Sequence, residues 1–195
     1  ALLQHFGTCS GHSSIILRAK IGEVLVYALR RAGRAAPRFA TQSLATAFSV
    51  VHQWTAIESI EEGQILLQSA VSLIAETIVM AGWSAAGSQL RDALDIANGI
   101  LREPNHMVRL RRAGAFLVRY IVEGLHTKLL HMDTGGEHLK SAYVILKRSC
   151  DDADNIVRFQ SRNALSLLSD YMREQLFISG NDERLHAVPK IKILH

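Results

Sequence analysis

Apolar residues recur along this chain at intervals of three and four positions, the spacing that places them on one side of an α-helix. The clearest stripe, within residues 88–102, consists of Leu90, Ala93, Leu94, Ala97, Ile100 and Leu101. We predict seven helices of this kind, at about residues 13–32, 37–54, 64–81, 88–102, 105–125, from 134 onward, and 151–177. A period of two, which would indicate a strand, occurs only in the short segment 190–194.

Glycine and proline mark the predicted helix boundaries. Gly33 suits the position just after a helix, and Pro37 suits the first turn of the next one. The first long helix is expected to bury a stripe made of Leu17, Ile21, Val24, Leu25 and Ala28. Beyond Ser179-Gly180-Asn181 the periodicity is lost, so we predict an irregular C-terminal tail over residues 179–195.

Four of the predicted helices repeat one another at steps of 48, 45 and 49 residues, counted from Ile16, Gln64, Arg109 and Arg158. Six positions after each of these comes a small residue: Gly22, Ala70, Ala115 and Ala164. Such a period with two helices per unit is typical of HEAT and armadillo repeats. We therefore predict a single all-α domain over residues 1–195, a HEAT/armadillo-like α-solenoid of about four helix pairs wound as a right-handed α-α superhelix.

Composition agrees with a helical domain that has a substantial core. Of the 195 residues, 48% are hydrophobic and 21% charged, and only 3 are proline. Arg, Glu, Gln or His interrupts every apolar run before it reaches the roughly 20 residues of a membrane span, so no transmembrane segment is expected. The chain opens at Ala1, without Met, inside an apolar stretch, and we expect a fragment from the C-terminal end of a longer solenoid.

The residues that could carry chemistry do not form a convincing site. His126, His131 and His138 surround one predicted loop with Asp133, and their spacing does not suit a zinc site. Cys9 lies near two histidines, but no third group orients a base there.

The two cysteines, Cys9 and Cys150, have no CxxC partners and fit a reducing compartment. No phosphate-binding glycine loop is present. The sequence therefore predicts no catalytic, cofactor or metal residues.

Basic residues are the most suggestive surface feature. The net charge is +4 and the isoelectric point about 9.3. Arg109, Arg111, Arg112 and Arg119 cluster on the fifth predicted helix, either as a solvated face or as a docking surface for an acidic partner. No aromatic residues interleave with these arginines, which makes a nucleic-acid site the weaker alternative. The candidate partner-binding residues are Arg109, Arg112, Arg119, Lys190 and Lys192.

Several segments resemble one family when they are read in order: Arg18–Glu23, Ser69–Glu76, Val108–Ala115, Asp154–Leu168, Asp170–Phe177 and Lys190–Leu194. Together they are similar to the C-terminal HEAT region of the transport and Golgi organization protein 6 family, whose fungal relative is an RNA polymerase II nuclear-import and assembly factor. Arg112 and Gly114 depart from the family's alanines, and residues 179–188 form a longer segment than the family has.

The resemblance implies a non-enzymatic scaffold or adaptor without cofactors. Its partners would be proteins such as polymerase subunits, chaperones or transport factors, rather than small-molecule substrates. It would act in the cytoplasm, with shuttling to the nucleus or a peripheral Golgi association. A nucleic-acid-binding HEAT-like solenoid is the alternative, and salt-dependent DNA binding would favour it. An enzyme and a membrane-peripheral protein are the remaining hypotheses.

Overall fold

The computed structural model describes residues 1–8, 12–54, 61–81, 89–129 and 135–183. Almost all of these residues are helical and none lies in a strand, so the prediction of an all-α protein is confirmed. The helices are α1 (Leu2–Thr8), α2 (His12–Ala32), the short 3-10 turn η1 (Gly33–Ala35), α3 (Pro37–Trp54), α4 (Glu61–Ala81), α6 (Leu90–Arg102), α7 (Val108–Leu129), α8 (Gly135–Ser149) and α9 (Asn155–Glu183).

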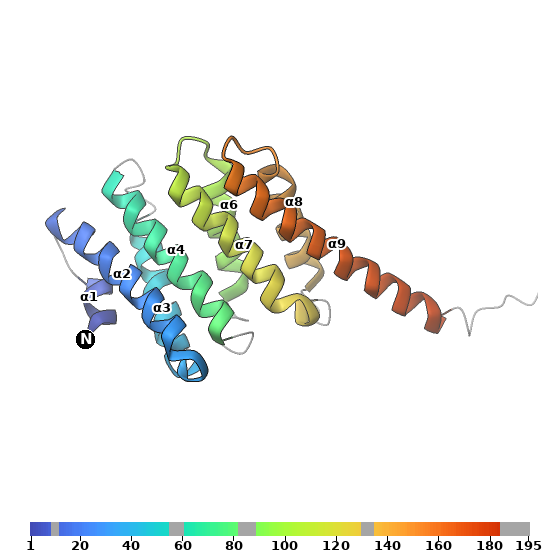
Figure 1. The fold of residues 1–195 in the computed structure, drawn as a ribbon, viewed down its shortest axis with the longest axis horizontal. Coiled ribbons are helices and arrows are strands. Elements are labelled where there is room, and N and C mark those ends of the chain that lie inside the picture. Colours follow the sequence, from blue (N-terminus) through green and yellow to red (C-terminus); the bar gives the residue numbers. More distant parts are fainter. Residues whose placement is uncertain (9–11, 55–60, 82–88, 130–134, 184–195) are drawn as a thin grey trace, which may run out of the picture.

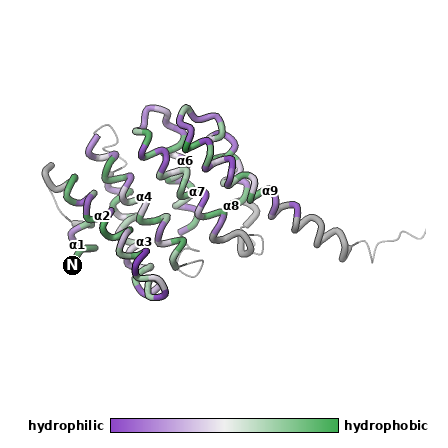
Figure 2. The backbone as a smooth tube through the Cα atoms, viewed as in Figure 1, coloured by the Kyte–Doolittle hydropathy of each residue, from purple (hydrophilic) through white to green (hydrophobic). Residues whose placement is uncertain are grey.

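The helices pack in two layers. In the front layer α2 packs on α4, α4 on α7, and α7 on α9, so that these four helices lie side by side in chain order (Figure 1). The second layer lies behind them, where α1 packs on α3 and α6 on α8. Each second-layer helix also packs on the front-layer helix that follows it in the chain. Hydrophobic and hydrophilic residues alternate in short blocks along the helices (Figure 2), as expected where each helix has a buried side.

Local sequence explains several helix boundaries. α3 begins at Pro37, whose fixed φ suits the first turn of a helix and whose missing N–H is not needed there. Gly33, just after α2, has a φ of +50°, a conformation that costs glycine little. Asp154 precedes α9, and its Oδ1 accepts hydrogen bonds from the backbone N–H groups of Ile156 and Val157. This carboxylate thereby caps two otherwise unpaired donors.

The small residues at the four predicted equivalent positions lie in the protein interior. Gly22, Ala70, Ala115 and Ala164 are all buried. A Cβ added to Gly22 would lie 2.7 Å from Ser69 Oγ on α4 and 2.8 Å from Phe6 Cε2 on α1. α2 therefore sits so close to its neighbours that this position has no room for a side chain.

The prediction for the buried side of α2 is wrong in part. Leu17 and Val24 are 58% and 53% exposed, Ala28 is also exposed, and Ile21 and Leu25 are half-buried. The buried residues of this helix are Ile15, Arg18, Ala19, Gly22 and Leu29. α2 is the first helix of the front layer and carries apolar residues on two sides, so periodicity alone does not select the side that packs.

The predicted irregular tail over 179–195 also needs correction. α9 continues to Glu183, through the Ser179-Gly180-Asn181 segment that was expected to end it. A single glycine inside a helix costs only about 1 kcal/mol relative to alanine, which does not stop a long helix. Residues 184–195 lie outside the described part of the chain, as do Lys190 and Lys192. The sequence also gave no sign of α1, which is only 7 residues long.

In the described residues, α4 is the one helix that is long and apolar enough to span a membrane by length and composition. Its most apolar window is mostly buried inside the protein, against α2, α3 and α7. This burial is that of a core helix. Gln64, Gln68 and Glu76 interrupt the apolar residues of α4, as expected from the sequence, although the mean hydropathy of the helix stays high.

Candidate functional site

The predicted arginine cluster lies on α7, but its members have different environments. Arg109 is exposed and, within the described residues, has no hydrogen bond or ion pair. Arg112 and Arg119 are half-buried, and both bind residues of the α8–α9 region. Arg111 is buried. The sequence places all four on one helix without showing which of them solvent reaches.

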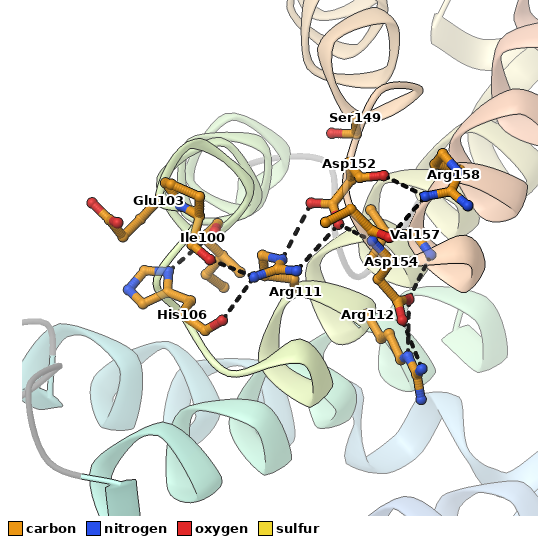
Figure 3. Close-up of polar contacts among 12 residues, drawn as sticks. Ile100, Glu103, His106, Arg111, Arg112, Ser149, Asp152, Asp154, Val157 and Arg158 are labelled. Atoms are coloured by element: carbon orange, nitrogen blue, oxygen red, sulfur yellow. Dashed lines mark hydrogen bonds and ion pairs between the residues drawn. The ribbon is translucent and has the colours of Figure 1, made fainter.

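Arg111 is a structural residue, and the hypothesis that it belongs to a surface cluster is wrong. Its guanidinium donates a hydrogen bond of 2.5 Å to the carbonyl oxygen of Pro104. A second one, of 3.0 Å, reaches the carbonyl oxygen of His106 (Figure 3). A further hydrogen bond of 3.3 Å reaches Oδ1 of Asp152, while Nε lies 3.2 Å from Oδ2 outside hydrogen-bond geometry. Arg111 therefore joins the α6–α7 loop to the turn before α9.

Arg112 makes a two-pronged ion pair with the residue that caps α9. Its Nε and one Nη lie 3.0 and 2.7 Å from the two carboxylate oxygens of Asp154. The hydrogen bond from Arg112 is the main reason that the pKa of Asp154 falls to about 2, and backbone donors from Val157 and Ile156 act in the same direction against partial burial. The same hydrogen bond raises the pKa of Arg112. The pair thus holds one candidate side chain in a fixed position.

Arg119 is also engaged within the protein. It forms an ion pair with Glu123, four residues later on α7, and donates a hydrogen bond to Oε1 of Gln160 on α9. Two of the three predicted contact arginines on α7 therefore serve the junction between α7 and α9, and Arg109 is the one left available.

A hollow of about 300 Å³ opens between α2, α4 and α7, beside Arg109. Its lining residues are Arg30, Gln68, Ser72, Ala75, Glu76, Arg109, Arg112, Ala113, Phe116 and Tyr120. Glu76, a buried carboxylate, forms a 2.9 Å ion pair with Arg30 from α2. The rings of Phe116 and Tyr120, with centroids 6.0 Å apart, add an aromatic wall. Positive charge from two helices thus meets an aromatic surface in one concave place, and the expectation that no aromatic residue interleaves with these arginines is wrong, since Phe116 lies between Arg112 and Arg119.

Sequence reasoning missed most of this hollow. The sequence pattern singles out none of Arg30, Phe116 and Tyr120 as site residues. A signal exists in the spacing, because several polar partners across the structure lie at sequence separations close to the predicted period. Arg111 and Asp152 are 41 residues apart, Arg112 and Asp154 are 42 apart, and Gln64 binds the backbone of Met107 at a separation of 43.

No metal centre is present in the described part of the chain, where no three His, Cys, Asp or Glu side chains gather closely enough to hold an ion. Of the three histidines predicted around a loop, His126 lies on α7 and His138 is half-buried on α8, and His131 lies outside the described residues. Cys150 is half-buried, and its burial raises the pKa of its thiol, which favours an unreactive form.

Comparison of the chain with protein-family models, with curated proteins and with solved structures finds no match. The resemblance to the transport and Golgi organization protein 6 family accordingly stays a prediction.

Proposed function

We propose that this protein is a HEAT-like solenoid that acts as a non-enzymatic scaffold or adaptor and holds an acidic protein segment against its front layer. The repeat spacing supports the solenoid. Successive front-layer helices pack in chain order, and polar links such as Arg112 to Asp154 join residues 42 positions apart, close to one repeat. Contacts that reach only the next unit are what a linear array of helix pairs requires.

The two layers differ in a way that supports binding on the front face. α4 and α7 pack on each other, whereas within their described residues α3 and α6 are not a packed pair. A gap of about 320 Å³, lined in part by Val51 and Ile96, lies on that side. When the helices of one layer pack more closely than those of the other, the row of helix pairs curves toward the more closely packed layer. The front layer would then form the inner face of the curve, where solenoids hold extended partners.

The proposal of an acidic partner rests on Arg109, which is exposed at the edge of the hollow and has no ion pair with any residue that the structure describes. A guanidinium binds carboxylates and phosphates in two-pronged geometry, and its charge persists at neutral pH. The carboxylate of the hollow, Glu76, is occupied by Arg30. The hollow is therefore better suited to holding a partner's acidic side chain, with an apolar neighbour on Phe116, than to acid–base catalysis.

The family resemblance would place such partners among cargo-transport proteins or RNA polymerase II subunits and their assembly factors. The corresponding locations are the cytoplasm, the nucleus by shuttling, and the periphery of the Golgi. These assignments rest on the sequence segments alone. A nucleic-acid-binding solenoid remains the alternative, favoured by the net charge of +4.

The test is a binding assay with a library of acidic synthetic peptides, each carrying an aromatic residue near a run of Glu or Asp. We expect binding that weakens with salt and falls at least about tenfold on Arg109→Glu, since reversing one contact charge adds repulsion to the lost attraction. Arg102→Glu, an exposed arginine on α6 in the second layer, is the matched control and should bind as the wild type does.

Two results would contradict the proposal. Equal peptide binding by the Arg109→Glu and Arg102→Glu variants would remove the front face from recognition. Tight, salt-dependent binding to a short DNA duplex, without binding to any acidic peptide, would favour the nucleic-acid alternative.

A further inference from the structure

The outer side of α2 carries an apolar stripe that no other described helix covers. Leu17, Ile21, Val24 and Ala28 follow one another at steps of four, three and four residues, which aligns them along one side of the helix. Leu17 is 58% and Val24 53% exposed, Ala28 is exposed, and Ile21 is half-buried. No charged residue interrupts the stripe, which therefore offers a continuous apolar strip to a partner.

The next front-layer helix shows what normally lies against this side. Ser69 and Glu76 of α4 come 48 residues after Ile21 and Ala28, and both are buried. α2 covers them, because Gly22 lies against Ser69 and Arg30 pairs with Glu76. This side of a front-layer helix thus receives another helix, and on α2 the corresponding side is apolar rather than polar.

The stripe is complementary to itself when two copies of α2 are placed antiparallel. A two-fold axis midway between Gly22 and Glu23 sets Leu17 opposite Ala28 and Ile21 opposite Val24. The largest residue then faces the smallest, and the two middle residues face each other, so the side chains fill space evenly along the contact. Antiparallel helices also oppose their dipoles favourably.

We propose that α2 is a self-association surface through which two copies of this chain form a two-fold dimer. The match between large and small residues commits the surface to a second copy. A two-fold interface uses the same patch on both subunits, as this stripe does. The proposal is independent of the front-face binding role, since the stripe lies on the flank of α2 that is turned away from α4 and the hollow.

The dimer is expected to be reversible. Three turns of one helix on each side bury less than the roughly 1,200 Å² that stable complexes bury. We therefore expect a dissociation constant of roughly 1–100 μM. At lower concentrations the protein is a monomer.

Sedimentation equilibrium of the full 195-residue chain, over protein concentrations from about 1 to 500 μM that bracket this range, is the first experiment. We expect the mass to rise from monomer to dimer, and Val24→Lys and Leu17→Lys each to weaken association at least about tenfold. Both side chains are more than half exposed, so these variants should fold. Phe159→Lys, at a residue that is 58% exposed on α9, is the control and should dimerise as the wild type does.

Disulfide trapping tests the antiparallel geometry. In a background with Cys9→Ser and Cys150→Ser, the Leu17→Cys and Ala28→Cys proteins are oxidised separately and as a mixture. We expect cross-linked dimer mainly in the mixture, because residue 17 faces residue 28 of the other copy and lies about 16 Å from its own equivalent, at 1.5 Å per helical residue. Cross-linking of each protein with itself alone would overturn the antiparallel pairing. A monomer at every concentration, or a dimer that neither lysine substitution weakens, would overturn the interface itself.

Discussion

The junction between α2 and α4 and the junction between α7 and α9 solve the same packing problem by different means. At the first, Gly22 lets two helices approach until a Cβ would touch Ser69, and the main cross-link is a single ion pair at the edge. At the second, Arg111 and Arg112 of α7 bind Asp152 and Asp154 in the turn before α9. The first junction depends on shape and the second on charge as well. They should therefore respond differently to small changes in volume and to changes in charge or pH.

Removal of Arg111 should be the most damaging single change. Arg111→Ala takes away the partners of two carbonyl oxygens and leaves Asp152 as an uncompensated, largely buried carboxylate. Breaking one side of such a pair costs about 3–5 kcal/mol of unfolding free energy. Urea unfolding followed by circular dichroism measures this loss. Arg109→Ala on the same helix should change stability by less than about 0.5 kcal/mol, and equal losses would refute the structural role of Arg111.

The second-largest loss of stability is expected from a larger side chain on the buried side of α9. Ala164 is fully buried on α9, at the position equivalent to Gly22. Ala164→Leu should cost about 1–3 kcal/mol, since the added atoms have no space. The exposed residue Ser166 on the same helix gives the control, because Ser166→Leu adds similar bulk into solvent. A thermal melt that shows no difference between the two variants would remove Ala164 from the seam.

At the α2–α4 junction, Gly22→Ala should destabilise the protein although alanine is the better helix former. The new methyl group would lie within 2.9 Å of both Ser69 Cβ and Phe6 Cε2. We expect a net loss of about 1 kcal/mol, with the overpacking cost partly offset by the helix propensity of alanine.

Gly99→Ala is the matched control for this prediction. Nothing lies within 4 Å of the Cβ position at Gly99 on α6. This substitution should stabilise the protein by up to about 1 kcal/mol, through helix propensity alone. If both glycine substitutions stabilise the protein, the close approach of α2 to α4 is wrong.

The smallest predicted effect tests the ion pair between Arg112 and Asp154 at the α7–α9 junction. Asp154→Asn keeps a side chain that can cap α9 but removes the charge facing Arg112, and should cost up to about 1 kcal/mol at pH 7. The pKa of Asp154 is about 2 in the folded protein, against the ordinary aspartate value of 3.8 that applies in the unfolded chain. A lowered pKa stabilises the folded state above the unfolded value, and this stability is lost as pH falls from about 4 to 2. Wild type and variant should therefore converge over that range, and a gap that widens in acid would contradict the ion pair.

The sequence alone predicts a helix and its buried side correctly where proline marks the start of the helix or where the apolar stripe is strong. α3 begins at Pro37 and ends at Trp54 as expected, and the six apolar positions predicted for 88–102 are all buried in α6. The burial of Arg111 could not be predicted from the sequence, because a helical pattern assigns charged residues to the surface unless a partner is known. That partner, Asp152, comes 41 residues later and only the packed structure identifies it. For α2 the buried side could not be predicted, because apolar residues lie on two sides of the helix and the periodicity fits both.

The order of packing has a consequence for how the protein comes apart. Among the described helices, the extensive contacts all lie within a pair or between adjoining pairs, so no extensive contact ties the first pair to the last. Closing such short loops costs little entropy, and folding is expected to be fast and to spread from wherever it starts. Pulling on the two ends, or heating, should release terminal pairs before central ones. Hydrogen exchange would then be slowest in α4 and α7 and would quicken toward both ends of the row.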